Sequence, residues 1–229
     1  MIDYFRVPRT VSNTDDALHC LQAAFIMTVE TLSDIVVSDL EAEQITGFKS
    51  GVETWPYRML SWLSGNNFDV IHVDAISAQG LSVDPRAELV RTGFDNDTIE
   101  YFFKISDFKA EAQAIDECLV RGVEFENRLP TLDDISVRIR DGWLPVVALD
   151  AGILTQEDRS GYQGHMVLVT GWHESRSLAR IQDSGPPARW NWDVPSDLVA
   201  AAMRSPADSS GTITFVRRTT GSGARNGTQ

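Results

Sequence analysis

The pattern of apolar and polar positions predicts helices in the first part of the chain and strands in the last part. Apolar residues recur at near-helical spacing after Cys20, so a helix with a buried face is expected from Cys20 to about Leu32. Spacing of the same kind, together with capping and stop signals, predicts further helices. They cover residues 40–47, 55–63, 87–92, 106–119, 131–140 and 197–203.

Strands are expected where apolar residues run without a break or alternate with polar ones. The continuous apolar runs 144–149 and 165–172 predict buried strands, and the alternation over 68–73 predicts a half-buried one. The other expected strands cover residues 2–8, 178–183 and 212–216. Helices first and strands later is an α+β pattern, in which the helices are segregated from a mostly antiparallel sheet.

A single domain over residues 1–218 is expected, because a chain of 229 residues can bury one large core. Within it, residues 84–120 are acidic and helical in pattern. We expect them to be an insertion that covers or flanks the functional site. Residues 219–229 are rich in Gly, Ser and Thr, which predicts a disordered tail.

The net charge of −13 comes without a basic patch, which argues against nucleic acid or an anionic membrane as a partner. The two cysteines, Cys20 and Cys118, do not make a disulfide framework, and free thiols fit a reducing cytoplasm. No apolar run reaches membrane-spanning length, and the N-terminus lacks the apolar stretch of a signal peptide. A cytoplasmic protein is therefore expected.

Cys20 is notable because it stands near the start of its expected helix. The preceding residues 12–16, Ser-Asn-Thr-Asp-Asp, all have side chains that can cap free backbone N–H groups. A thiol at a helix start feels the positive end of the helix dipole, which favours the nucleophilic thiolate. A lone cysteine is otherwise a small buried apolar residue, as we expect for Cys118 in its acidic helix.

Two later residues favour the catalytic interpretation of Cys20. His165 opens one expected strand and Asp183 closes the next, so pairing of the two strands as a hairpin would bring both to one end of the sheet. Each alone has an ordinary explanation, as a boundary histidine and a turn aspartate. Together they supply what a thiol nucleophile needs, which is a base for its proton and a carboxylate to orient that base.

The segments around these residues resemble papain-like proteins related to the bacteriocin-leader (double-glycine) peptidases, the peptidase domains of peptide-exporting ABC transporters. That family has Gly-His-Phe/Tyr-Val-Val-Val, then Gly-Tyr, then Asp-Pro-Gly. The resemblance covers both ends of the chain, about a third of its residues. The matching segments are Val7-Pro8, the polar loop before Cys20, the Cys20 helix, and residues 164–172 and 181–185.

The resemblance implies a papain-like fold, in which the helix of the nucleophile packs on a C-terminal sheet. It implies that Cys20 is the nucleophile, that His165 is the general base and then the acid, and that Asp183 orients the histidine. It also implies an oxyanion hole made by the backbone N–H of the cysteine and a Gln side chain six positions earlier. Thr14 holds that position here. Asn13, one residue before it, offers the same amide donor on a shorter arm.

Two departures from the family pattern bear on the substrate. Leu21-Gln22 stand where the family has Gly-Pro, and Ser184 stands where it has proline. The resemblance therefore extends further for the nucleophilic chemistry than for peptidase specificity.

The expected function is a cysteine-nucleophile acyl-transfer enzyme of the peptidase or amidase type. Its substrate would be a peptide, an amide or an acyl thioester, with delivery on a carrier protein as one option. An acyl-enzyme resolved by an amine or a carbanion would instead make the protein an acyltransferase or a cyclase. The alternative of another class is a binding module that kept the fold and lost the chemistry. No zinc-binding spacing and no Gly-rich phosphate loop after a strand occur, so no cofactor or metal is expected.

Overall fold

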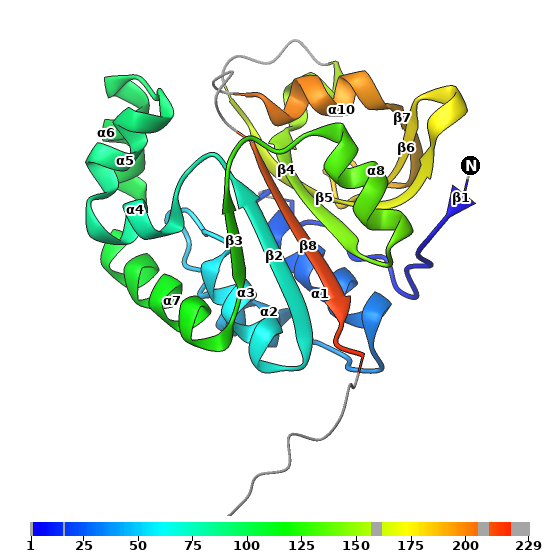
Figure 1. Cartoon of the computed structure of the whole chain (residues 1–229), viewed down its shortest axis with the longest axis horizontal. Helices are drawn as coiled ribbons and strands as arrows, with labels where there is room; N and C mark the ends of the chain where they lie inside the picture. Colours follow the sequence, from blue (N-terminus) through cyan, green and yellow to red (C-terminus); the bar gives the residue numbers. More distant parts are fainter. Residues whose placement is uncertain (1, 16, 157–161, 206–210, 221–229) are drawn as a thin grey trace, which may run out of the picture.

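The computed structural model of this chain describes residues 2–15, 17–156, 162–205 and 211–220. The strands in these residues form one sheet that lies between two layers of helices (Figure 1). Across the sheet the order is β3 (Glu124–Asn127), β2 (Phe68–Asp74), β8 (Thr212–Arg218), β4 (Leu144–Asp150), β5 (Gly164–His173), β6 (Leu178–Asp183) and β7 (Arg189–Pro195). The short β1 (Ile2–Asp3) pairs with β5.

The sheet is mostly antiparallel, and its one parallel pair in the described residues is β2 with β3. The predicted mixed α+β class is therefore confirmed. The sheet is not purely C-terminal, however. The middle of the chain supplies β2 and β3, and β8 lies between β2 and β4. The last described strand thus joins the two parts of the sheet.

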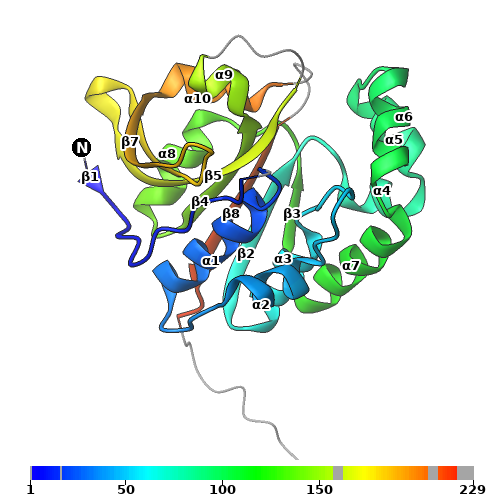
Figure 2. The same ribbon diagram turned by 180° about the vertical axis from the view of Figure 1, so that it is seen from behind.

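Helices cover both faces of the sheet rather than being segregated from it. One face carries α1 (Cys20–Leu32), α2 (Asp39–Thr46), α3 (Tyr57–Gly65) and α7 (Phe108–Arg121), and Figure 2 shows α1 to α3 in front of the sheet. The other face carries α8 (Leu132–Arg140), α9 (Ala151–Thr155) and α10 (Ser196–Met203).

Strand β2 shows why the sequence did not indicate this second layer. Phe68 and Val70 pack in the core with α1 and α3, whereas Ile71 and Val73 pack with α8 and α10. The strand is therefore buried on both faces, and its prediction as a half-buried strand was wrong. The polar residues that gave the impression of alternation are enclosed, because His72 is only 1% exposed.

Helix α1 begins at Cys20 and ends at Leu32, as the apolar spacing predicts. The residues from Leu21 to Val29 are all buried, so the helix is held firmly in the core. Its start was predicted wrongly in one respect. The position before the helix is His19, and no side chain caps the first turn. The polar residues 12–16 lie further upstream, outside the capping position.

Two other helix ends follow their local signals. Helix α2 ends at Gly47, whose φ of 73° is the left-handed conformation that glycine adopts readily. Helix α8 begins with a capping box, in which Thr131 and Asp134 each accept a hydrogen bond from the backbone of the other.

Several short elements were not predicted. They are α4 (Ala78–Val83), α6 (Asn96–Ile105), α9, β3 and β7. The expected strand over residues 2–8 is reduced to β1, after which the N–H groups of Tyr4 and Phe5 both donate to the carbonyl of Thr170. Short elements carry few residues of hydrophobic pattern, and tertiary contacts decide whether they form.

The acidic segment 84–120 comprises α5 (Pro85–Thr92), α6 and α7, and it is joined to the rest of the chain. The thiol of Cys118 in α7 donates to the carbonyl of Tyr57 at 3.1 Å. The indole N–H of Trp55 donates to the hydroxyl of Ser106 at 3.0 Å. The segment is therefore packed on α3. Of the predicted tail, residues 221–229 lie outside the described residues.

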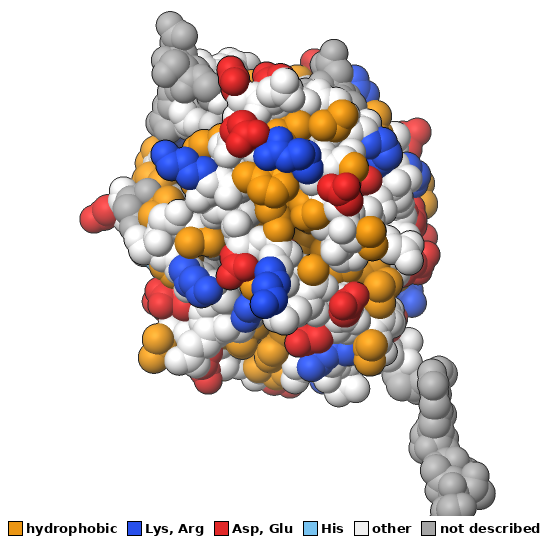
Figure 3. All heavy atoms as spheres, turned by 90° about the vertical axis from the view of Figure 1, so that its left-hand side faces the viewer, with side chains coloured by type: hydrophobic (Ala, Val, Ile, Leu, Met, Phe, Trp, Pro, Cys, Tyr) orange, Lys and Arg blue, Asp and Glu red, His pale blue; other side chains and the backbone are white. Residues whose placement is uncertain are grey.

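The outer face of α4–α7 is seen in Figure 3, where hydrophobic side chains lie in patches with acidic and basic side chains between them. The described side chains on this face form no continuous basic surface. None of the helices in the described residues combines the length and apolar composition needed to cross a membrane.

Candidate active site

Cys20 is the first residue of α1, and its side chain is partly exposed at the edge of a cavity. At this position its backbone N–H has no acceptor within the helix, because the first turn lacks preceding carbonyls. Cys20 therefore stands at the positive end of the helix dipole, where negative charge is stabilised.

His165 and Asp183 lie on neighbouring strands, as predicted. In the register of β5 and β6, Asp183 stands opposite Val167, so His165 is its diagonal neighbour on the same face. The Nε2 atom of His165 lies 2.8 Å from Oδ1 of Asp183. Both residues are buried, with exposed fractions of 8% and 2%. The carboxylate thus fixes the orientation of the ring.

The side chain of Cys20 lies close enough to His165 to raise the pKa of its imidazole. Since Nε2 is held by Asp183, Nδ1 is the ring nitrogen that is left for the thiol. Burial by itself lowers the pKa of His165, but the hydrogen bond to Asp183 and the nearby side chain of Cys20 outweigh it and raise the pKa to about 9. The ring therefore holds a proton strongly at neutral pH. Cys20 and His165 line the same cavity, and Asp183 holds His165 from behind.

The carboxylate of Asp183 has further donors around it. Its Oδ1 also accepts the backbone N–H of Gly185 at 2.8 Å, and Nη1 of Arg189 lies 3.2 Å from its Oδ2. Burial would raise the pKa of Asp183, but its bonds to His165, Gly185 and Arg189 keep that pKa below its ordinary value. Asp183 is therefore ionised at neutral pH. Arg189, in β7, was not identified from the sequence because β7 was not predicted.

Asn13 connects the loop before α1 to the end of β6. Its side-chain amide donates to the carbonyl of Gly185 at 3.0 Å, and its Oδ1 accepts the backbone N–H of His19 at 2.7 Å. Its own N–H donates to the carbonyl of Ser184. Asn13 thus positions Cys20 relative to Asp183. Its predicted role as an oxyanion donor stays a prediction, and would use the amide hydrogen that Gly185 does not take.

A cavity of about 160 Å³ opens beside Cys20 and His165. Apolar side chains from the start of α1, the segment before α3, the turn after β2 and the α5–α6 region line it, among them Leu21, Trp55, Pro56, Ile76, Phe94 and Phe102. Two residues of the segment 84–120, Phe94 and Phe102, therefore line the cavity. The sequence did not indicate the individual residues, because aromatic residues spread over some forty positions show no local pattern that points to a shared cavity.

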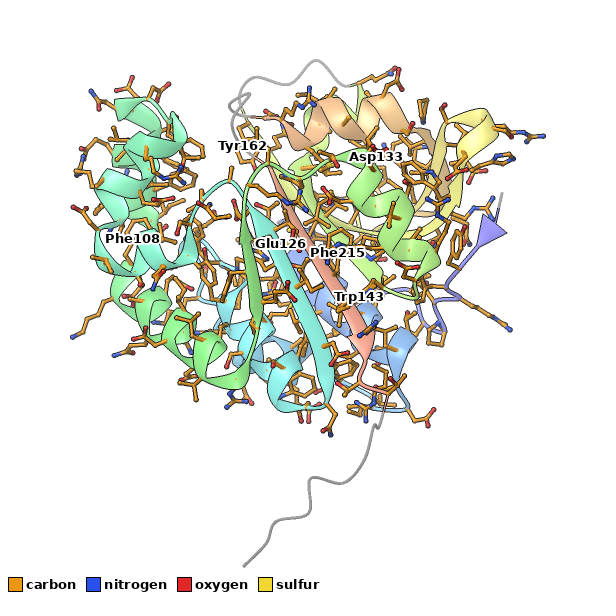
Figure 4. The ribbon with its side chains drawn as sticks, viewed as in Figure 1. Phe108, Glu126, Asp133, Trp143, Tyr162 and Phe215 are labelled. Carbon is orange, nitrogen blue, oxygen red and sulfur yellow. The ribbon has the colours of Figure 1, made fainter. Side chains whose placement is uncertain are left out.

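Tyr162 stands at the mouth of this cavity, near the end of the sheet where β2 finishes and β8 begins (Figure 4). Its ring packs on Gly164, where an added Cβ would come within 3.2 Å of the ring. A larger residue there would therefore displace Tyr162 and disturb the strand directly before His165. In the sequence, the feature that pointed to this part of the chain was the pair Gly164-His165.

Other residues weighed from the sequence have structural roles. The ring of His19 lies between the hydroxyl of Thr14, at 2.8 Å, and the carboxylate of Glu43, at 3.0 Å. Cys118 is fully buried in α7. Burial first, and then the charge of Glu117, raise the pKa of the Cys118 thiol to about 12. Its thiol therefore stays protonated at neutral pH.

The described residues contain no group of three or more His, Cys, Asp or Glu side chains placed to hold a metal ion. In comparisons with known proteins, no protein-family model matches this chain and no curated protein has a significant match to it.

Proposed function

We propose that this chain is a cysteine-dependent acyl-transfer enzyme that acts as a peptidase or amidase on a peptide, amide or acyl-thioester bond. The observation that supports the proposal most is the placement of His165. Its ring is hydrogen-bonded to Asp183 and lies near the side chain of Cys20, beside a cavity that Cys20 and His165 both line. Nucleophilic thiol catalysis needs these three groups in this order.

The geometry supports a two-step reaction. The proton that Cys20 gives up is held on His165, whose pKa is raised to about 9. The sulfur then attacks the carbonyl carbon, and the negative oxygen forms near the backbone N–H of Cys20. When the intermediate collapses, the imidazolium gives its proton to the leaving amine or thiol. Water then attacks the acyl-enzyme while His165 takes its proton, and the acid and the free thiol are released.

The resemblance to the bacteriocin-leader peptidases supports a papain-like arrangement of these groups, with the nucleophile at a helix start and the histidine on the sheet. The cysteine helix and the His165 strand agree with this in the described residues. A free thiol nucleophile works in a reducing compartment, so we place the protein in the cytoplasm.

The acyl-enzyme is common to hydrolysis and to transfer, so an acyltransferase or a cyclase would use the same three residues. The difference lies in which nucleophile reaches the acyl-enzyme. Adding a competing nucleophile to the reaction therefore distinguishes the two. Slow hydrolysis of the acyl-enzyme together with fast transfer of its acyl group to an amine would favour the transferase.

The test uses p-nitrophenyl acetate as an activated acyl donor, with release of nitrophenol and the intact mass of the protein as readouts. We expect the wild type to form an acetyl adduct on Cys20 and to turn over. The variants Cys20→Ala and His165→Ala should fall to the background rate, and hydroxylamine should divert the product to the hydroxamate. Cys118→Ala, at the buried second thiol, is the matched control and should keep the activity. Equal rates in the wild type and in Cys20→Ala would favour the binding-module alternative.

A further inference from the structure

Part of the cavity lining is aromatic and held by contacts between its rings. The rings of Phe94 and Phe102 meet edge to face with centroids 5.7 Å apart, and the ring of Trp55 lies 5.8 Å from that of Phe102. The polar atom of Trp55 is occupied, because its indole N–H donates to Ser106. These three side chains therefore present apolar surface to the cavity from two separate parts of the chain.

The size of the cavity limits what can occupy it. A dry cavity of about 150 Å³ lined by Leu, Ile and Phe is known to take up benzene. The cavity beside Cys20 measures about 160 Å³. It therefore suits a ring or chain of about six carbon atoms, and longer chains would have to extend past it.

Among the described residues that line the cavity, His165 is the one basic side chain. The acidic side chains among them are Glu53 and Asp74. Asp74 is fixed, because its carboxylate accepts the hydroxyl of Thr212 at 2.9 Å and the N–H of Ile76 at 2.8 Å. A carboxylate on the substrate would meet these two acidic side chains, and the described lining residues include no lysine or arginine to offset them.

We infer that this cavity is the acyl-group site and that it takes an uncharged apolar chain or ring of about six carbon atoms, while a carboxylate at the end of the chain is rejected. The inference rests on the proposed function, because Cys20 lines the same cavity and would carry the acyl group into it. Phe102 and Phe94 then set the length that fits. The acyl part of the substrate is thus an aliphatic acyl chain or an apolar side chain.

The test uses acyl thioesters of N-acetylcysteamine with acetyl, hexanoyl, decanoyl and adipoyl groups. The sulfur of Cys20 bonds to the carbonyl carbon, the bond to N-acetylcysteamine breaks, and that thiol leaves with the proton from His165. Water then hydrolyses the acyl-enzyme. Because each buried CH₂ contributes about 0.8 kcal/mol, kcat/KM for hexanoyl should exceed that for acetyl by at least about tenfold. It should exceed the value for adipoyl, which has the same length and a terminal carboxylate, by a similar factor.

Variants of α6 give a matched pair. Phe102→Trp fills the cavity and should shift the preference from hexanoyl toward acetyl, whereas Phe102→Ala enlarges it and should favour decanoyl. Tyr101→Trp makes the same kind of change one residue away, at a side chain that is 58% exposed and does not line the cavity. This control should leave the order of preference unchanged. Rates that are independent of chain length, or unaltered by both Phe102 variants, would overturn the inference.

Binding to Cys20→Ala separates failure of the cavity assignment from failure of the proposed function. Calorimetry with hexanoyl and adipoyl N-acetylcysteamine should show hexanoyl bound at least several-fold more tightly, with the difference lost when Phe102→Trp is added. If that difference is found and the wild type still releases no thiol, the proposed function fails and the cavity assignment stands. If the wild type releases thiol but binding does not distinguish the two acyl groups, the cavity assignment fails alone.

Discussion

The side-chain amide of Asn13 donates to the carbonyl of Gly185 at 3.0 Å and so joins residues that are 172 positions apart. Asn13 precedes the helix of Cys20, and Gly185 closely follows the strand that ends with Asp183. The same side chain accepts the N–H of His19, next to the nucleophile. One side-chain amide therefore links the loop before the helix of Cys20 to the end of the Asp183 strand.

We expect Asn13→Ala to loosen this connection. The loss of the bonds to Gly185 and His19 should lower the free energy of unfolding by about 1–3 kcal/mol. It should also slow alkylation of Cys20, because the thiol no longer faces His165. Urea unfolding and the rate of reaction with iodoacetamide measure the two effects. Ser12→Ala, at the exposed neighbouring position, should stay within about 0.5 kcal/mol of the wild type. Unchanged behaviour of Asn13→Ala would rule out this positioning role.

The two cysteines should differ in reactivity. At about pH 6, iodoacetamide should label Cys20 first, because the imidazole of His165 takes the thiol proton, and should leave Cys118 unmodified, because burial holds its pKa at about 12. His165→Ala should slow the labelling of Cys20. Asp183→Asn should slow it less, because an amide can still orient the ring. The urea-unfolded protein is the control, in which both thiols should react alike. Equal and slow labelling of both cysteines in the folded protein would contradict the Cys20–His165 pairing.

The raised pKa of His165 predicts a pH dependence of stability. The folded state holds the proton more strongly than the unfolded state, in which the pKa is about 6.5. This contribution is fully present below about pH 6.5 and is lost as the pH rises toward 9. The free energy of unfolding should therefore fall between these values. Cys20→Ala should show a smaller fall, because it removes one cause of the shift, and His165→Gln should show the smallest. If the free energy of unfolding of the wild type falls no more steeply with pH than that of His165→Gln, this would be evidence against the ion pair between His165 and Asp183.

Glu111 in α7 is expected to destabilise the protein at high pH. It is 8% exposed and its Oε2 atom is buried without a hydrogen-bond partner. Burial raises its pKa to about 7, although Arg58 and Lys49 oppose the shift. The unfolded chain releases this proton near pH 4.5, whereas the folded chain holds it to about pH 7. The free energy of unfolding should therefore fall as the pH rises from about 4.5 through 7.

Replacing Glu111 by Gln removes this titration. Glu111→Gln should raise the free energy of unfolding at pH 8 by about 1–3 kcal/mol and should change it little at pH 5. Glu124→Gln, at an exposed position of β3, is the control and should have no such pH-dependent effect. Thermal unfolding at both pH values measures the difference. A destabilised Glu111→Gln at pH 8 would show that the charged side chain is stabilising.

The elements that the sequence predicted well are those with long local patterns. Helix α1, the helix start of α8 and the strands β4 to β6 follow from spacing and capping within about ten residues. The aligned ends of β5 and β6 follow from a short hairpin, so the local pattern alone predicts that His165 and Asp183 are neighbours. The same local reasoning predicts Cys20 at a helix start.

The sequence by itself thus determined the helices and strands with strong periodicity and the three residues that meet at the candidate site. Only the tertiary structure decided that β8 lies between β2 and β4, that Asn13 holds Gly185, and that Phe94 and Phe102 line the cavity of the thiol. The physical reason is that local patterns record only which faces of an element are apolar. The partner of each face is chosen by burial across the whole chain, between residues whose separation in sequence carries no signal.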